Sequence, residues 1–439
     1  MARLKVVVVG GGVAGLVAAD SSRGADDEAS ITVLSEEPHL PYRRPALPLV
    51  VKGCVPSLAA ITMFDRKALW LRRIKYLSGT RAVSVDLRGG SVKAVKWSGR
   101  EVRVQFDRLI LATGGRPIKP GIKGSDKPGV YVLRKFEDAQ TLSRAARPGR
   151  RAVIVGAGFV GLIVSEALSR RGMKVRLVEL RSHILPDLFE PDLAARIQRR
   201  VISSGIEVMT GTTIDKISGG ERVESVRIAG EDLKASMVVL TTGVGPDVGL
   251  AESIGAAVGR RGVVVDCHMQ TSCPGVYAAG DCVEVFDLVT GGRIYLPVGS
   301  VAAEGGEVAG LNSVGREVAV RGFLRAQDER VFDLDLVSIG LTGRKAGEAG
   351  IRTSVVDLAE VGDHGRGSWA DVRVMLDSRS RVVGAQMIGS RLNRRKVNAL
   401  LTSVRAGAGF DELQGLWSRR FLTVHDLLES RVASGTVPS

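Results

Sequence analysis

The chain has 439 residues, 44% of them hydrophobic, and a formal net charge of +15 at pH 7. Its length allows two or three domains with sizeable cores, and no apolar run approaches the ~20 residues of a membrane helix. Lys and Arg are spread along the whole chain and aromatic residues make up only 4% of it, which argues against nucleic-acid binding. We expect a cytoplasmic protein with no membrane span and an Arg-rich surface; attraction of an acidic partner or of phosphate-bearing substrates is the alternative.

The chain begins with an apolar run that leads into a glycine-rich turn. Four valines at 6–9 precede Gly10, Gly12 and Gly15, the spacing of a dinucleotide-binding fingerprint. The first glycine allows a tight strand-to-helix turn, the second lets the backbone approach a pyrophosphate, and the third packs helix on strand. The next predicted strand, 31–34, leads to Glu36 and Glu37, and a carboxylate at this point would bind a ribose hydroxyl pair.

The same pattern recurs 146 positions later. An apolar run at 152–155 precedes Gly156, Gly158 and Gly161, and the strand that follows ends at Glu179. In both copies the phosphates would lie at the positive end of a helix, where unpaired N–H groups point toward them. Two copies of one fingerprint predict an internally duplicated α/β protein with two Rossmann-like units that hold two dinucleotides.

Between and after these units the pattern changes. A loop and a β-rich stretch end at residues 109–114, and a linker rich in Gly and Pro follows. From about residue 331, alternating patterns predict strands at 370–376 and 382–388, and helices at 394–406 and around 410–417. This C-terminal block carries no catalytic signature, so we expect it to pack against the nucleotide units or across a dimer.

The cysteines and histidines do not indicate a metal site. Cys54, Cys267, Cys273 and Cys282 form no CxxC pair, and the five histidines are scattered. We therefore expect buried free thiols and no metal. Only three asparagines beside many charged residues are typical of a thermophile.

Together these residues resemble the pyridine nucleotide-disulfide oxidoreductases, two-dinucleotide flavoproteins. Ala112-Thr113-Gly114 is similar to the family's ATG motif, and the stretch 271–281 resembles its second flavin motif. The resemblance implies that Asp281 hydrogen-bonds the ribityl chain of FAD. The C-terminal block is similar to that of NADH oxidases and coenzyme A-disulfide reductases, in which Phe421 and Asp426 match a dimer-interface motif. A homodimer is therefore expected.

The resemblance implies FAD and NAD(H) as cofactors, with NADP(H) as an alternative coenzyme, and four segments. These are an FAD-binding domain in two parts (1–112 and 246–328), an NAD(P)-binding domain (113–245) and a C-terminal α+β dimerisation domain (329–439). The candidate cofactor-binding residues are Gly10, Gly12, Val13, Ala14, Gly15, Glu36, Arg44, Pro45, Val83, Ala112, Thr113, Gly114, Arg116, Gly280, Asp281, Pro297, Val298, Gly156, Gly158, Phe159, Val160, Gly161, Glu179 and Gly243.

Three departures from the family pattern bear on function. The redox cysteine of the oxidase branch is replaced by Pro45, in a Pro-Tyr-x-Arg-Pro stretch similar to that of ferredoxin and rubredoxin reductases. The lysine and glutamate that many members pair near the flavin are replaced by Leu49 and Ile163. A histidine that peroxidase members use is Val13. Losing both partners of an ion pair leaves no charge unpaired, so the site would be apolar and no protein residue is expected to be catalytic.

Four functions remain open at this point. The first is an FAD-dependent NADH oxidase that forms peroxide without a cysteine relay. The second is a reductase for a small acidic carrier such as ferredoxin or rubredoxin. The third is coenzyme A-disulfide or polysulfide reduction through Cys54 or a substrate thiol, and the fourth is a flavin-binding protein without turnover. Glu179 would repel a 2′-phosphate and favours NADH, although Arg181 and His183 could accommodate NADPH.

Overall fold

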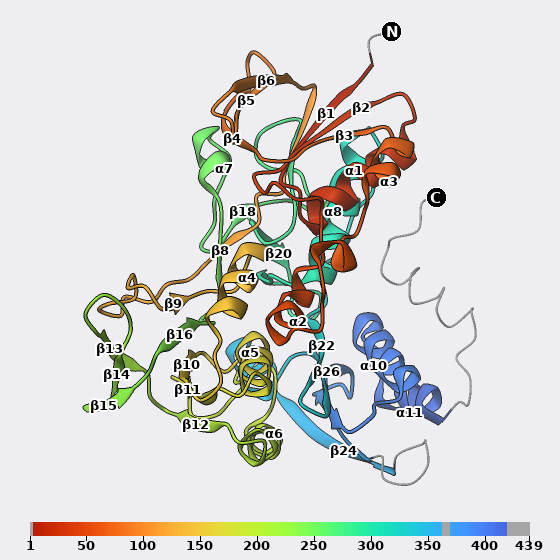
Figure 1. Cartoon of the computed structure of the whole chain (residues 1–439). Coiled ribbons are helices and arrows are strands. Elements are labelled where there is room, and N and C mark those ends of the chain that lie inside the picture. Colours follow the sequence, from red (N-terminus) through yellow and green to blue (C-terminus); the bar gives the residue numbers. More distant parts are fainter. Residues whose placement is uncertain (1–2, 362–368, 419–439) are drawn as a thin grey trace.

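The computed structural model describes residues 3–361 and 369–418. Figure 1 shows the red N-terminal strands at the top, the yellow and green second unit at the lower left, and the blue C-terminal unit at the lower right. Each unit is organised around one sheet of five strands. The mixed α/β class with parallel sheets that the sequence predicts is confirmed. Phe421 and Asp426 lie outside the described residues.

The first parallel sheet contains the apolar run at the start of the chain. Its strand order is β19-β7-β1-β2-β3, and all neighbouring pairs are parallel. Val9, at the end of β1, lies beside Leu34 and Leu111, so the loops after these strands open at one edge. The elements are β1 Lys5–Val9, α1 Val13–Ala25, β2 Ser30–Leu34, β3 Ile74–Leu77, β7 Arg108–Leu111, β19 Val276–Ala278 and α8 Gly299–Ser313.

Helices α1 and α8 pack backbone to backbone although they are far apart in the sequence. A Cβ at Gly306 would lie 2.4 Å from the carbonyl oxygen of Ala14, and one at Gly310 would lie 2.3 Å from that of Ala18. Only glycine permits this approach at these two positions of α8. The contact fixes the start of α1, where the first glycine turn ends.

Smaller sheets and short helices surround the first sheet. One sheet is antiparallel, with β4 Thr80–Asp86, β5 Ser91–Lys96 and β6 Glu101–Gln105, and another has β18 Val263–Val264, β20 Val283–Phe286 and β21 Arg293–Tyr295. The short helices are α2 Leu47–Lys52, α3 Arg66–Leu71 and α7 Gly249–Ser253. Of these helices, α2 packs against α4 and α5 of the second unit.

The second parallel sheet repeats the architecture of the first. Its order is β12-β11-β10-β16-β9, and Val155 at the end of β10 lies beside Val178 and Leu240. The elements are β9 Val130–Tyr131, α4 Phe136–Ala145, β10 Arg151–Val155, α5 Phe159–Arg170, β11 Lys174–Glu179, α6 Pro191–Ser203, β12 Glu207–Thr210 and β16 Met237–Leu240, with the antiparallel strands β13 Ile214–Ser218, β14 Ser225–Ile228 and β15 Glu231–Lys234. The second βαβ unit expected from the sequence is thus confirmed.

Two paired strands connect the first unit with the second. The chain leaves the first unit through β8 (Gly115–Pro117) and returns through β17 (Val244–Pro246), which pair antiparallel. This two-strand connection lies next to the carboxyl ends of both sheets, since β8 follows β7 and β17 follows β16.

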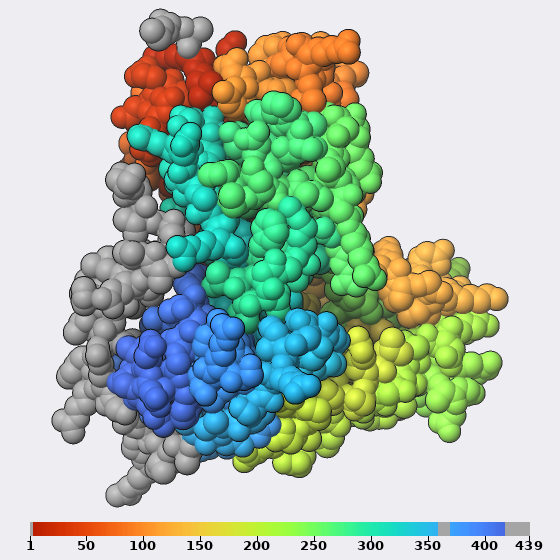
Figure 2. Space-filling view, turned by 180° about the vertical axis from the view of Figure 1, so that it is seen from behind, coloured from red at the N-terminus to blue at the C-terminus, as the bar shows by residue number. Residues whose placement is uncertain are grey.

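The C-terminal unit is an antiparallel sheet covered by helices. Its order is β22-β23-β26-β25-β24, and Figure 2 shows this unit in blue against yellow and teal segments of the other two units. The elements are β22 Ala326–Val331, β23 Leu334–Gly340, α9 Gly343–Glu348, β24 Thr353–Val361, β25 Trp369–Asp377, β26 Val382–Gly389, α10 Arg394–Ala406 and α11 Phe410–Ser418. The strands and helices predicted after residue 369 are confirmed. Among the described residues, no helix has the length and hydropathy to cross a membrane.

Candidate functional site

The first glycine turn is shaped by close backbone contacts and leaves one face open. Gly10 has φ +121°, and a Cβ there would lie 1.9 Å from the carbonyl oxygen of Ala112. A Cβ at Gly15 would lie 1.9 Å from the carbonyl oxygen of Gly10, whereas nothing lies within 4 Å of one at Gly12. No side chain caps the N-terminus of α1. Unpaired N–H groups therefore face open space, as a bound pyrophosphate requires.

The second glycine turn has the same construction. A Cβ at Gly161 would lie 1.9 Å from the carbonyl oxygen of Gly156, a Cβ at Gly158 would meet nothing within 4 Å, and α5 has no side-chain cap. Phe159 is buried behind this turn, and Val160 is 46% exposed beside it. The residues present fit a second dinucleotide, because space and free donors again coincide.

Glu179 organises the second turn from the end of β11. Its buried carboxylate accepts hydrogen bonds from the backbone N–H of Ala157, at 2.7 Å, and of Arg181, at 2.9 Å. Each carboxylate oxygen has further acceptor capacity. Glu179 can therefore hold the glycine loop and accept hydrogen bonds from ribose hydroxyls at once.

The acidic residue of the first unit is placed differently. Strand register makes Ser35, not Glu36, the equivalent of Glu179, because Leu34 pairs with Val9 as Val178 pairs with Val155. Glu36 is one residue further on, with a side chain 54% exposed and 3.9 Å from Lys135 Nζ. It remains a candidate for the ribose, but from a more open position than Glu179.

Glu37, the second carboxylate after the predicted strand, is more buried than Glu36. Its side chain is only 13% exposed, and it accepts hydrogen bonds from Arg44 Nη2 and from the Tyr42 hydroxyl, both at 2.5 Å. Arg44 Nη1 also donates to the carbonyl oxygen of Arg134 at 2.7 Å. The Pro-Tyr-x-Arg-Pro stretch is thus held against the residues that precede α4.

Asp281 forms an ion pair with Arg134, a residue that the sequence pattern did not indicate. Arg134 Nη2 donates to Asp281 Oδ2 at 2.6 Å, and the Nε atom of Arg134 is buried without a hydrogen-bond partner. The Tyr295 hydroxyl is buried and unpartnered as well, and burial raises the pKa of Tyr295. Two orphaned donors beside Asp281 fit a polar group of a bound flavin nucleotide. No local pattern marks Arg134 or Tyr295.

The remaining candidates of the first unit surround the same loops. Thr113 donates from its hydroxyl to the carbonyl oxygen of Asp247 at 2.6 Å, and Arg116 pairs with the Asp247 side chain at 3.0 Å. Val83 lies at an irregularity in the pairing of β4 with β5, where a backbone leaves its ladder. The other positions lie after strands or at the starts of helices of the first unit: Val13 and Ala14 in the first turn of α1, Ala112 and Gly114 after β7, Gly280 after β19, and Pro297 and Val298 before α8. Gly243 precedes β17 with φ +103°.

The start of α2 carries no thiol. Pro45 lies in a short 3-10 turn, Arg44–Ala46, directly before α2. Cys54 follows the other end of α2, which is about 9 Å long, and the backbone N–H of Cys54 donates to the Leu49 carbonyl oxygen at 2.9 Å. Cys54 is exposed and unbridged. The structure therefore separates Cys54 from the position at which a family cysteine would lie.

The other thiols are placed unfavourably for redox chemistry. Cys282 is completely buried, and this burial raises the pKa of its thiol, which opposes formation of a nucleophilic thiolate. Cys273 is buried and Cys267 half-buried. In the described part of the chain, no group of three His, Cys, Asp or Glu side chains could hold a metal ion.

Leu49 and Ile163, which the resemblance matches to a lysine and a glutamate of many family members, lie on α2 and α5. Leu49 is 41% exposed and Ile163 packs at the edge of a core cluster. One helical turn further along both helices, Lys52 Nζ lies 3.0 Å from Glu166 Oε1. The chain therefore has an ion pair between these helices, displaced by three residues in each.

Comparison with known proteins connects this geometry to a family. The model of the pyridine nucleotide-disulphide oxidoreductases matches residues 4–294. An NADH oxidase of Methanocaldococcus jannaschii is 31% identical over 420 residues, which cover 94% of each chain. A coenzyme A-dependent NAD(P)H sulfur oxidoreductase of Pyrococcus furiosus is 28% identical over 416 residues, which cover 93% of this chain and 92% of that one.

Solved structures agree with these sequence relatives. An NAD-dependent persulfide reductase from A. fulgidus superimposes with a TM-score of 0.90 at 31% identity, covering 98% of this chain and 83% of that chain. A ferredoxin reductase from Rhodopseudomonas palustris superimposes with a TM-score of 0.78 at 25% identity, covering 88% of this chain and 91% of that chain.

Proposed function

We propose, from the premise that the chain belongs to the pyridine nucleotide-disulphide oxidoreductase family, that it transfers electrons from NADH to an acceptor without a cysteine relay. The chain is an oxidoreductase that uses FAD and NAD(P)H. FAD, when bound, would supply the chemistry that accepts hydride from NADH and passes two electrons onward. In air the proposed reaction converts NADH, a proton and O₂ into NAD⁺ and hydrogen peroxide.

The residues of the chain would bind and orient the two nucleotides. The open faces at Gly12 and Gly158 would take the two pyrophosphates, and Glu179 would accept from the NADH ribose. Arg134, Asp281 and the Tyr295 hydroxyl would hold polar atoms of the flavin nucleotide. Hydride transfer depends on stacking and orientation, not on a protein acid or base, which fits the absence of an assigned catalytic residue.

The placement of the cysteines carries this proposal. Pro45 precedes α2, Cys54 follows its far end, and Cys282 is completely buried with a raised pKa. Reduction of O₂ to water in this family uses an oxidised cysteine close to the flavin. This chain has Pro45 at the matching position, and burial of Cys282, which adjoins Asp281, opposes formation of a thiolate. Peroxide is therefore the proposed product.

The test is the stoichiometry of NADH oxidation in air. The purified, FAD-loaded protein should form one hydrogen peroxide per NADH consumed, and Cys54→Ser should keep the rate within about twofold, because an exposed thiol beyond α2 takes no part. NADH consumption with no peroxide formed would contradict the proposal. Loss of turnover in Cys54→Ser, with FAD retained, would assign a relay to Cys54.

A second candidate is reduction of a persulfide or polysulfide. The relatives in Pyrococcus and A. fulgidus that carry such names align over most of this chain. Anaerobic NADH oxidation that requires added polysulfide or coenzyme A persulfide, and that exceeds the rate with O₂, would favour this function. Retention of that activity in Cys54→Ser would show that the thiol comes from the substrate.

A further inference from the structure

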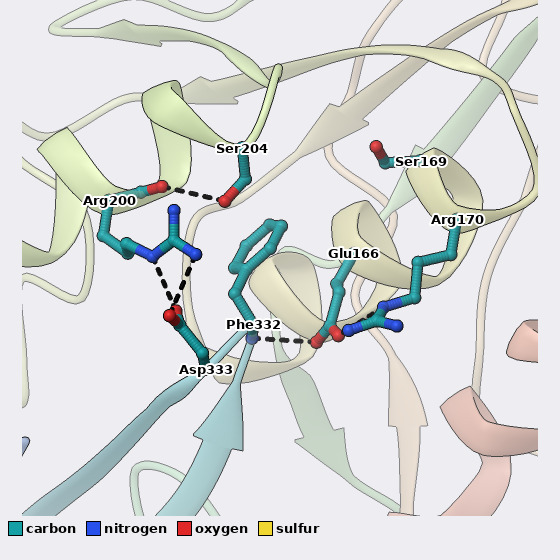
Figure 3. A pocket seen from close by; sticks show the side chains of 7 residues that line it. All are labelled: Glu166, Ser169, Arg170, Arg200, Ser204, Phe332 and Asp333. Carbon is teal, nitrogen blue, oxygen red and sulfur yellow. Dashed lines mark hydrogen bonds and ion pairs between the residues drawn. The ribbon is translucent and has the colours of Figure 1, made fainter. Parts of the chain in front are cut away.

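One buried carboxylate connects all three units of the molecule. Glu166, on α5 of the second unit, has a side chain only 6% exposed. It receives Lys52 Nζ of α2 at 3.0 Å, Arg170 Nε of its own helix at 2.9 Å, and the backbone N–H of Phe332 at 2.9 Å. Phe332 belongs to the β22–β23 turn of the C-terminal unit. Figure 3 shows its backbone nitrogen bonded to Glu166, where α5 meets this unit.

These contacts connect Glu166 to different parts of the molecule. The Arg170 bond lies within one helix, four residues apart, and connects nothing else. The Lys52 bond joins α2, which begins just after the candidate residues Arg44 and Pro45, to α5, which begins at the second glycine turn. Lys52 therefore connects two helices that begin beside candidate residues of the two proposed nucleotide sites.

The position of the pair along the helices decides what it can do. Residues three apart lie on the same face of a helix, so Leu49 and Lys52 share one face of α2 and Ile163 and Glu166 share one face of α5. The ion pair therefore lies about one helical turn beyond the apolar residues Leu49 and Ile163. On α5, Ile163 is closer than Glu166 to the second glycine turn. The cleft in Figure 3, lined by Ser169, Arg200 and Asp333 as well, lies at the far half of α5.

Because the pair is buried, it restricts the position of α2 more than it stabilises the fold. Lys52 is 22% exposed and Glu166 6% exposed, and taking such charges out of water offsets most of their mutual attraction. Three well-formed hydrogen bonds to one carboxylate nevertheless restrict its position, because any shift of α2 would leave a buried charge underpaired.

We propose that Lys52 and Glu166 are positioning residues: their ion pair fixes α2, which begins just after Arg44, against α5, which begins at the second glycine turn, and so sets how the two proposed nucleotide sites face each other. This inference rests on the proposed function. It assigns the pair a role in the rate of hydride transfer and none in nucleotide binding, because the glycine turns and Glu179 are untouched.

The test compares Lys52→Met with a matched control, Arg170→Met. Both variants remove one donor from the same oxygen of Glu166, but only Lys52→Met releases α2. In anaerobic stopped-flow at saturating NADH, Lys52→Met should lower the limiting rate of flavin bleaching about tenfold or more. Arg170→Met should stay within about twofold and Lys52→Arg should recover most of the rate. The apparent Kd for NADH should be unchanged in all three.

Hydrogen–deuterium exchange supplies a readout without turnover. Amides of residues 47–54 should exchange faster in Lys52→Met than in Arg170→Met at equal occupancy by FAD. If Lys52→Met does not hold FAD, the apolar double variant Lys52→Met/Glu166→Met, which leaves no charge unpaired, replaces it and should show the same low limiting rate.

Two results overturn the inference. One is a limiting rate in Lys52→Met, or in the double variant, equal to that of the unmodified protein. The other is an equal loss in Arg170→Met and Lys52→Met, which would reduce the pair to general support of Glu166. A failure of NADH to bleach the unmodified protein would instead overturn the proposed function.

Discussion

At the scale of single residues, the candidate site depends on carboxylates held in place by hydrogen-bond donors of the backbone and of side chains. Glu179 accepts from two N–H groups around the second glycine turn, and Glu37 holds Arg44 and Tyr42. The sequence spacing predicted Glu179 because the end of a strand is a fixed distance from its glycine turn. It could not predict Arg134 or Tyr295, since these reach Asp281 only after distant segments meet.

Glu179 gives a prediction about coenzyme binding. Glu179→Gln should raise the KM for NADH about tenfold or more, because a neutral amide is a weaker acceptor for ribose hydroxyls and for the Ala157 N–H. The KM for NADPH should fall relative to that for NADH, because repulsion of the 2′-phosphate is removed. Steady-state kinetics with both coenzymes checks this, and an unchanged ratio of the two KM values would remove Glu179 from coenzyme selection.

Glu329 on β22 gives a prediction about pH. Burial, with Asp328 nearby, raises the pKa of Glu329 from 4.5 to about 7. Between these values the folded state binds more protons than the unfolded state, so this group makes stability fall as pH rises from 4.5 to 7. Glu329→Gln should therefore raise the free energy of unfolding at pH 7.5 by about 1–2 kcal/mol, with solvent screening allowed for. Denaturant unfolding at pH 4.5 and 7.5 measures this; an equal gain at both pH values would contradict it.

At the scale of elements, glycine positions decide how helices approach. Gly310→Ala in α8 should destabilise the protein by about 1–3 kcal/mol, because the new Cβ would meet the Ala18 carbonyl oxygen, 2.3 Å away. Gly415→Ala in α11 is the control, since its Cβ would meet nothing within 4 Å and should stabilise the helix by about 0.5–1 kcal/mol. Thermal unfolding of the two variants should shift in opposite directions, and a neutral Gly310→Ala would show that α1 and α8 can separate at little cost.

Elements were predicted best where the pattern is local. The helix expected at 394–406 is α10 with the same limits, because its apolar spacing and its Asn393 cap lie within a short segment. The displaced Lys52–Glu166 pair could not be predicted, since neither residue is marked by its neighbours in the chain. Its partners are defined only by how α2 packs on α5.

At the scale of the whole molecule, charge bears on the acceptor. A formal charge of +15 would favour association with an acidic electron carrier, the second function that the sequence leaves open. Reduction of such a carrier should slow by about tenfold between 50 and 500 mM salt, because screening weakens steering. A flat salt response in a carrier-reduction assay would count against this acceptor.

The segment limits at residues 112, 245 and 328 stay predictions. The homodimer stays a prediction too, because the dimer-motif residues Phe421 and Asp426 lie outside the described part of the chain. Light scattering of the purified protein addresses the dimer directly.

The central claim is that NADH reduces FAD in a site without a second redox centre. Anaerobic titration with NADH, followed through the flavin absorbance, tests it most directly. We expect complete bleaching after one equivalent of NADH per FAD. A requirement for two equivalents would reveal a disulfide or thiol relay and contradict the account.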